Sequence, residues 1–181
     1  VVVPDAPVDS KGNKIDSLFE YHYYKNHFFD NIDFSDARLL RTPILYYKLN
    51  QFFSRIVVQI PDSIDVEAEK VIEKSKANKD VFQYVLQFIF NYANSSQIMG
   101  MDKVFVFLAD KYYLTGEATW VDSSFVKKIK DRVNELKPNL IGNASPELKM
   151  NTYDGKYVSL HQVKAKYTIL VFWDPDCGHC K

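Results

Sequence analysis

The spacing of apolar residues changes once along the chain, and this change limits the folds that the chain can adopt. Across residues 15–137, apolar side chains recur every three or four positions, as they do in amphipathic helices. A stretch rich in proline, glycine, asparagine and serine follows at 138–146. Beyond this linker, at 147–181, apolar residues form short extended runs. The sequence therefore predicts a helical domain followed by a β-rich segment, and we expect residues 1–14 to be loosely ordered.

About six helices with short connectors are expected in the helical domain. They run from Ile15 to Phe29, from Pro43 to before Pro61, from Asp62 or Ser63 through Ile72, from Asp80 through Phe90, from Val104 through Leu114, and from Asp122 to before Pro138. Thr42 and Asp80 are typical helix-capping residues. The run 104–108 alone also fits a strand, but its continuation to a glycine stop at Gly116 favours a helix. The helix after Asp80 has a double apolar stripe and is expected to be the most buried.

Composition and charge exclude several classes of protein. The chain is 46% hydrophobic and 15% aromatic, which is enough for a substantial core. Lys and Arg together number 23, as do Asp and Glu, so the balance gives no electrostatic reason to expect nucleic acid as a partner. No apolar run reaches the roughly 18 residues of a membrane span, so no transmembrane segment is expected. The first residues lack a basic flank followed by an apolar core, and no signal peptide is expected in them.

The β-rich segment carries the strongest chemical signal. Two short extended stretches flank the turn dipeptide Asp154-Gly155, and the apolar run 167–173 is expected to be a buried strand. The chain's two cysteines, Cys177 and Cys180, follow this run. In the first turn of a helix their sulfurs would lie on one face, within bonding reach of each other. This layout is typical of a dithiol redox centre.

Other chemistry for the cysteines is weaker but open. A zinc site needs four ligands, and only His22, His27 and His161 are available outside the motif. His22 and His27 do not share a helical face, so we expect no metal pair there. An inert, structural cysteine pair is the remaining alternative. No cofactor is expected. The tyrosines of the helical domain favour core and rim packing over a partner groove; they include Tyr21, Tyr23, Tyr24, Tyr46 and Tyr47.

The C-terminal segment resembles the N-terminal third of a TlpA-like thiol-disulfide oxidoreductase of the thioredoxin superfamily. The resemblance lies in residues 141–148 (Ile-Gly-Asn-Ala-Ser-Pro-Glu-Leu), 153–160 (Tyr-Asp-Gly-Lys-Tyr-Val-Ser-Leu) and 166–173, and in the Cys-x-x-Cys. It implies a truncated start of a thioredoxin-like α/β domain. About 35 residues cannot complete that fold, so low activity is expected of this chain alone.

The resemblance implies disulfide exchange with a disulfide-containing protein substrate, supported by an upstream thiol electron donor. Cys177, activated at a helix N-terminus, is expected to be the nucleophile, and Cys180 the resolving thiol. Five further residues are expected to shape the site: Trp173, Pro175, Asp176, Gly178 and His179. By analogy, His179 makes the pair more oxidising than a proline would. Asp176 departs from the family pattern, and its carboxylate should oppose thiolate formation.

The helical part resembles a domain of unknown function that precedes thioredoxin-like modules in exported proteins of the Bacteroidetes type. The resemblance lies in residues 29–36, 39–43 and 109–114. It implies a location in the periplasm or cell envelope, with any leader or lipid anchor outside this chain. A competing function is also open: the helical domain is an interaction module that docks the enzyme to a substrate or envelope partner.

Overall fold

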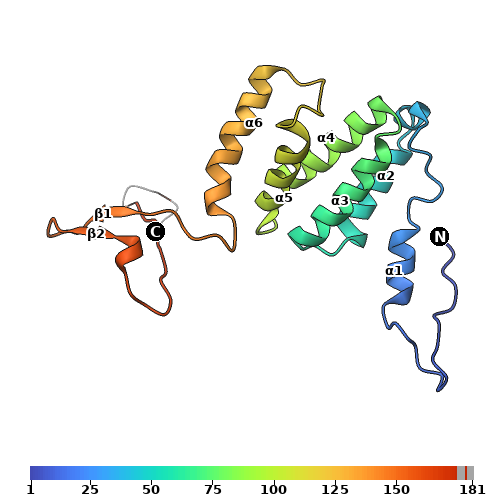
Figure 1. Ribbon diagram of the computed structural model, residues 1–181, viewed down its shortest axis with the longest axis horizontal. Helices are drawn as coiled ribbons and strands as arrows, with labels where there is room; N and C mark the ends of the chain where they lie inside the picture. The colour runs from blue at the N-terminus through green and yellow to red at the C-terminus, as the bar shows by residue number, and fades with distance from the viewer. Residues whose placement is uncertain (175–177, 179–181) are drawn as a thin grey trace. The chain divides into compact units, whose positions relative to one another are not determined.

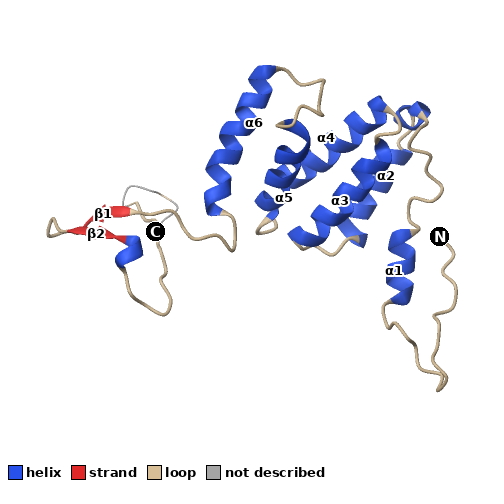
Figure 2. Cartoon of the chain, viewed as in Figure 1, coloured by secondary structure: helices blue, strands red, loops and turns tan. Residues whose placement is uncertain are grey.

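The computed structural model describes residues 1–174 and residue 178, and within them the chain is mainly helical (Figure 1). The chain forms two compact units, Val1–Asn143 and Ala144–Lys181. The first holds the six α-helices found among the described residues, and the second holds a two-stranded sheet (Figure 2). The α-helices are α1 (Phe19–Asn26), α2 (Ile44–Gln51), α3 (Pro61–Ser75), α4 (Lys79–Ser95), α5 (Met101–Leu108) and α6 (Ser123–Leu136). The expectation of a mainly helical fold with about six helices is confirmed.

The core of the first unit lies between α3, α4 and α5, which pack against one another. Helix α4 buries more side chains than any other described helix, as its double apolar stripe predicts. Its buried residues are Val81, Phe82, Val85, Leu86, Ile89, Phe90 and Ala93. Helix α5 begins after Gly100, whose φ of +87° favours glycine. A β-carbon there would also lie only 3.2 Å from the Pro61 side chain, so α3 and α5 approach closely at this point.

Two helices end in a π-helical turn. Helix α2 continues into Phe52–Ile56, and α5 continues into Ala109–Tyr113. Each turn is closed by a backbone hydrogen bond of 2.9 Å that spans five residues. In each, two adjacent aromatic residues are buried in the same core: Phe52–Phe53 in the first and Tyr112–Tyr113 in the second. The expected helix over 104–114 is thus present, with a wider last turn.

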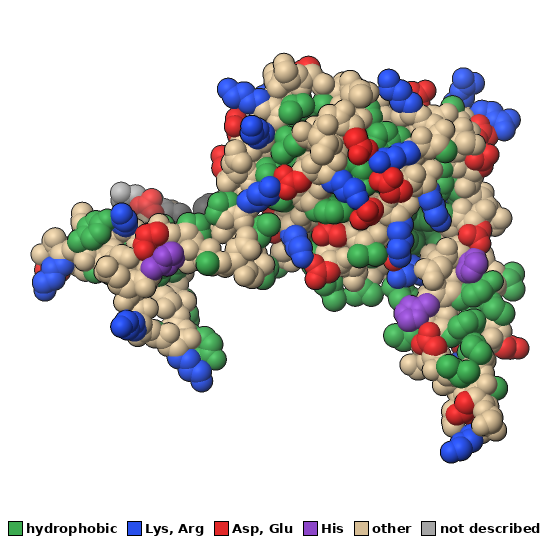
Figure 3. All heavy atoms as spheres, viewed as in Figure 1, with side chains coloured by type: hydrophobic (Ala, Val, Ile, Leu, Met, Phe, Trp, Pro, Cys, Tyr) green, Lys and Arg blue, Asp and Glu red, His purple; other side chains and the backbone are tan. Residues whose placement is uncertain are grey.

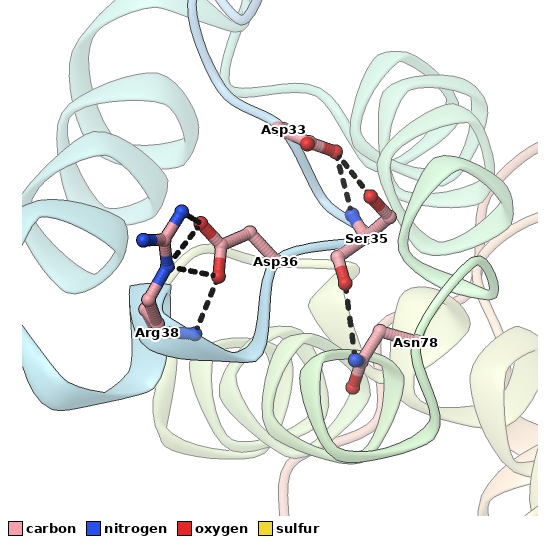
Figure 4. A network of polar contacts seen from close by, with 5 residues as sticks. All are labelled: Asp33, Ser35, Asp36, Arg38 and Asn78. Atoms are coloured by element: carbon pink, nitrogen blue, oxygen red, sulfur yellow. Dashed lines mark hydrogen bonds and ion pairs between the residues drawn. The ribbon is translucent and has the colours of Figure 1, made fainter.

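The start of α4 is fixed by a polar network with an earlier loop (Figure 4). The side-chain oxygen of Asn78 accepts hydrogen bonds from the backbone N–H groups of Asp80 and Val81, at 3.0 and 3.2 Å. Its amide nitrogen donates to the carbonyl oxygen of Ser35 at 3.1 Å. Asn78 therefore caps the helix and ties it to the loop. The prediction that Asp80 is the cap was wrong by two positions, because Asp80 already lies in the first turn.

Two other expected helix starts differ from the structure. Helix α1 begins at Phe19 rather than at Ile15, because the Asp16 carboxylate accepts the Leu18 N–H at 2.8 Å and holds a turn there. The Thr42 hydroxyl does not cap α2; it donates back to the Leu39 carbonyl at 3.2 Å, at the end of the 3-10 helix Ala37–Arg41. The expected start of the last helix at Asp122 is accurate to one residue, because Asp122 directly precedes α6 and its carboxylate accepts the N–H of the third residue of that helix at 2.8 Å.

The second unit is built on an antiparallel hairpin of β1 (Lys149–Asn151) and β2 (Tyr157–Ser159). Met150 pairs with Val158 at its centre. The turn contains Gly155 with a φ of +78°, as the Asp-Gly signal predicts. A short 3-10 helix, Leu160–Gln162, follows β2 directly.

Candidate functional site

A carboxylate and a histidine fasten the start of the second unit to the end of its hairpin. The Glu147 carboxylate accepts a hydrogen bond from the Ser159 hydroxyl at 2.8 Å and lies 3.3 Å from Nδ1 of His161. The other ring nitrogen of His161 lies 2.8 Å from the carbonyl oxygen of Ser145. The Ser159 hydrogen bond lowers the pKa of Glu147 most, and His161 adds to this. The Glu147 carboxylate and the His161 imidazole both bind groups within this unit, so we assign the cluster a structural role.

The apolar run that precedes the cysteines is not a buried strand. Residues 167–173 have no regular secondary structure, and most of their side chains are exposed. Phe172 is 82% exposed and Trp173 is 67% exposed. A strand needs a neighbour to bond its N–H and C=O groups, and the described residues provide none beside this run. The prediction of a buried strand was therefore wrong for this chain.

Most of the predicted redox site lies outside the described residues. Pro175, Asp176, Cys177, His179 and Cys180 belong to this group, so their proposed roles stay predictions. Gly178 is described, and a β-carbon built on it would meet no atom within 4 Å. Of the residues expected to shape the site, the structure therefore places only Trp173 and Gly178, and it shows both in open surroundings.

The histidines of the first unit pair with different carboxylates. His22 lies 3.0 Å from Asp16. His27 lies 2.5 Å from Asp30 and stacks on the Tyr23 ring, with centroids 4.1 Å apart. Across residues 1–174 and 178, no group of three metal-binding side chains comes together. On the face drawn in Figure 3, Lys, Arg, Asp and Glu side chains of the helical unit are interspersed, without a large patch of one sign.

Two carboxylates on α3, the buried Glu67 and the half-buried Asp65, were not among the residues to which the sequence pattern assigned a role. Glu67 is only 6% exposed, and one of its oxygens lies 2.9 Å from Nζ of Lys25 and 3.0 Å from Nζ of Lys70. Burial favours the neutral form, but the hydrogen bonds from both lysines outweigh it and lower the pKa of Glu67. Asp65 has a buried oxygen without a hydrogen-bond partner in the described part of the chain. The one available signal was position, since Glu67 lies three residues after Ile64 and four before Val71, on the apolar stripe.

Comparisons with known proteins give one match to a family model and one match in fold. Residues 15–139 match the model of DUF5106, a domain of unknown function. The whole chain is similar to the crystal structure, at 1.90 Å resolution, of a thioredoxin-like protein from Bacteroides caccae ATCC 43185. The TM-score is 0.67 at 19% sequence identity, which shows a shared fold. The similarity covers 99% of this chain but 63% of that protein, so this chain spans less than two thirds of its length. No curated protein matches this chain.

Proposed function

The chain belongs to the DUF5106 family, and on that premise we propose that the protein is a thiol-disulfide oxidoreductase of the cell envelope. The observation that carries the proposal is the Cys177-Gly178-His179-Cys180 motif, which follows an apolar run in a unit that comes directly after the family's helical domain. The similarity in fold to a thioredoxin-like protein supports the same conclusion. The TlpA-like resemblance of residues 141–173 makes disulfide exchange the expected reaction.

The proposed reaction moves two electrons from the cysteine pair to the substrate. The Cys177 thiolate attacks one sulfur of a substrate disulfide, the S–S bond breaks, and the other substrate sulfur leaves as a thiolate that takes up a proton. Cys180 then loses its proton and attacks the sulfur of Cys177. This step breaks the mixed disulfide and releases the second substrate thiolate, which is protonated in turn. The substrate is reduced, the pair becomes a disulfide, and an upstream thiol donor must reduce the pair again.

The neighbouring residues have proposed supporting roles. Protonated His179 favours the Cys177 thiolate by its positive charge, whereas Asp176 disfavours it. Trp173 and Pro175 would form the walls beside the sulfurs, and Gly178 leaves space for an approaching substrate backbone.

The experiment is a trapping assay on the 181-residue chain. The reduced chain is mixed with an aromatic model disulfide, and intact mass is measured over time. Cys180→Ser should accumulate a mixed disulfide on Cys177, because the resolving thiol is gone. Cys177→Ser should form adducts at least tenfold more slowly. Equal adduct formation by both variants, or a zinc ion bound to the purified chain and lost in both, would refute the redox proposal.

A further inference from the structure

Two cavities lie on the first unit between α4 and α6. Helix α5 contacts both α4 and α6, and its π turn contacts α6 (Figure 1). A cavity of about 360 Å³ lies at the start of α6, lined in part by Gln83, Trp120 and Phe125. A second cavity, of about 300 Å³, lies towards the end of α6, lined in part by Asn94 and Arg132. Each cavity is lined by residues of both α4 and α6, and we call the surface between these two helices the groove.

The α4 wall presents a row of amide side chains. Gln83, Gln87 and Asn91 are spaced four residues apart, so they lie on one face of the helix, and all three line the first cavity. Asn94 continues the row into the second cavity. None of the four side chains has a hydrogen-bond partner anywhere in the described residues. Gln87, Asn91 and Asn94 are exposed, and Gln83 is half-buried.

The spacing of these amides matches an extended polypeptide. Four residues of α-helix rise about 6 Å, and two residues of extended chain rise about 6.6 Å. Each amide side chain has a donor and an acceptor, and can therefore pair with the N–H and C=O of one peptide residue. Over three amides the two repeats diverge by only about 1 Å, which flexible glutamine side chains can absorb. The row therefore fits alternate residues of one extended strand.

The other sides of the first cavity are aromatic. The Tyr113 ring lies 4.6 Å from the Phe90 ring and 6.2 Å from the Phe125 ring, between centroids. Phe90 and Tyr113 are buried, whereas Phe125 is 41% exposed. The exposed ring of Phe125 suits an apolar side chain next to a peptide backbone.

The linings of the two cavities contain few charged side chains, which favours an uncharged ligand. In the first cavity, the one charged side chain of the lining residues is Asp122, and its carboxylate already accepts hydrogen bonds from the Phe125 N–H and the Ser124 hydroxyl, both at 2.8 Å. Tyr113 stays neutral because burial raises its pKa. The second cavity has one residue of each sign, Asp102 and Arg132. This balance disfavours phosphates and nucleic acids and complements an uncharged peptide.

We propose that this groove binds an extended, uncharged polypeptide segment of a partner protein. Its backbone pairs with Gln83, Gln87 and Asn91, and an apolar side chain packs on Phe125. The proposal concerns the helical unit alone and needs no thiol chemistry.

The test uses Trp120 as a reporter, because it lines the groove and the chain has one other tryptophan, Trp173. The full chain with Trp173→Phe is titrated with a capped heptapeptide of alternating threonine and valine with phenylalanine at its centre. A saturable change in Trp120 fluorescence is expected. Gln87→Ala and Asn91→Ala should each weaken binding about three- to tenfold, and together by more than tenfold. Gln51→Ala, which removes an exposed helical glutamine that lines neither cavity, is the matched control and should change nothing.

Three results would overturn the proposal: no saturation, equal binding of a peptide N-methylated at alternate residues, or equal binding by the amide variants. Binding of maltoheptaose in place of the peptide would assign the groove to a sugar instead. Unfolding curves check that the variants fold. We expect them to fold because Gln87 and Asn91 are exposed. Replacing Cys177 and Cys180 by serine should leave peptide binding unchanged, and Gln87→Ala should leave thiol trapping unchanged. Failure of one proposal is thus distinguishable from failure of the other.

Discussion

Replacing Asp65 by asparagine should stabilise the helical unit at neutral pH. One oxygen of Asp65 is buried without a hydrogen-bond partner within the described chain, and burial raises the pKa of this carboxyl to about 6. The carboxylate of Asp62 adds to the rise, and Lys103 on α5 opposes it. Lys103 is itself paired with Asp62, so it compensates Asp65 only in part. The charged form of Asp65 is therefore an electrostatic cost of the folded state at pH 7.

The sign of the pH dependence follows from proton binding. Because the folded state holds this proton more tightly than the unfolded chain, where the ordinary pKa is 3.8, stability falls as the pH rises from about 4 to about 6. A rise from 3.8 to about 6 corresponds to about 3 kcal/mol for a fully buried group. Asp65 is only partly buried, so solvent screening reduces this to about 1–2 kcal/mol.

The assay is urea denaturation followed by helical circular dichroism, at pH 7.5 and at pH 4. We expect Asp65→Asn to raise the free energy of unfolding by about 1–2 kcal/mol at pH 7.5 and by much less at pH 4. Asp131→Asn is the matched control, because Asp131 is an exposed aspartate in α6, and it should change little at either pH. Destabilisation of Asp65→Asn at pH 7.5, or an equal gain at both pH values, would refute the reasoning.

Two further predictions concern polar groups that hold the helices in place. Glu67→Gln should cost about 1–3 kcal/mol at pH 7, since it leaves Lys25 without its buried partner, whereas the more exposed Glu69→Gln should cost less than about 1 kcal/mol. Because the pKa of Glu67 is lowered, its contribution is present above the ordinary carboxyl pKa and lost as the pH falls through the lowered value; a penalty that persists at pH 2 would contradict this. Asn78→Ala should cost about 1–2 kcal/mol by urea denaturation, because it removes the α4 cap and the bond to Ser35. Asp80→Ala should cost less than half as much. A larger loss of stability for Asp80→Ala than for Asn78→Ala would instead indicate that Asp80 is the cap.

Local sequence signals predicted most of the helical unit, because its helices depend on short-range information. Apolar spacing located α3 to α6, and Asp122 and Gly116 marked two of their boundaries correctly. The errors concern helix starts, where one polar side chain determines at which of several neighbouring residues the helix begins. Asp16 forms a turn with Leu18, and Asn78 competes with Asp80 for the cap. Such choices depend on side-chain direction and on partners from other loops, which a residue's type does not reveal.

Long-range features were predictable only in part. The run 167–173 has strand composition, but strand formation depends on a hydrogen-bonding neighbour rather than on its own residues. The Cys-x-x-Cys motif can be identified from its spacing in the sequence, and its redox role remains a proposal. The amide row on α4 has the composition of an ordinary solvated face. A binding role for the row depends on the α6 residues that face it across the cavity. The α6 residue of that lining, Phe125, lies more than 30 positions after Asn91, so the sequence alone does not show that the two are close.

The π turns that end α2 and α5 have a consequence for how this fold can vary in length. Each accommodates one residue more than an α-helical turn, and successive residues of a helix are rotated by about 100°. The extra residue lets adjacent aromatic rings, such as those of Tyr112–Tyr113, enter the same core. Deleting one residue within Ala109–Tyr113 would convert the turn to α-helix without moving the start of α5. Deletions of one residue should therefore be tolerated at these two sites better than in the middle of α3 or α4, and chains that differ in length by one residue can share most of the same core.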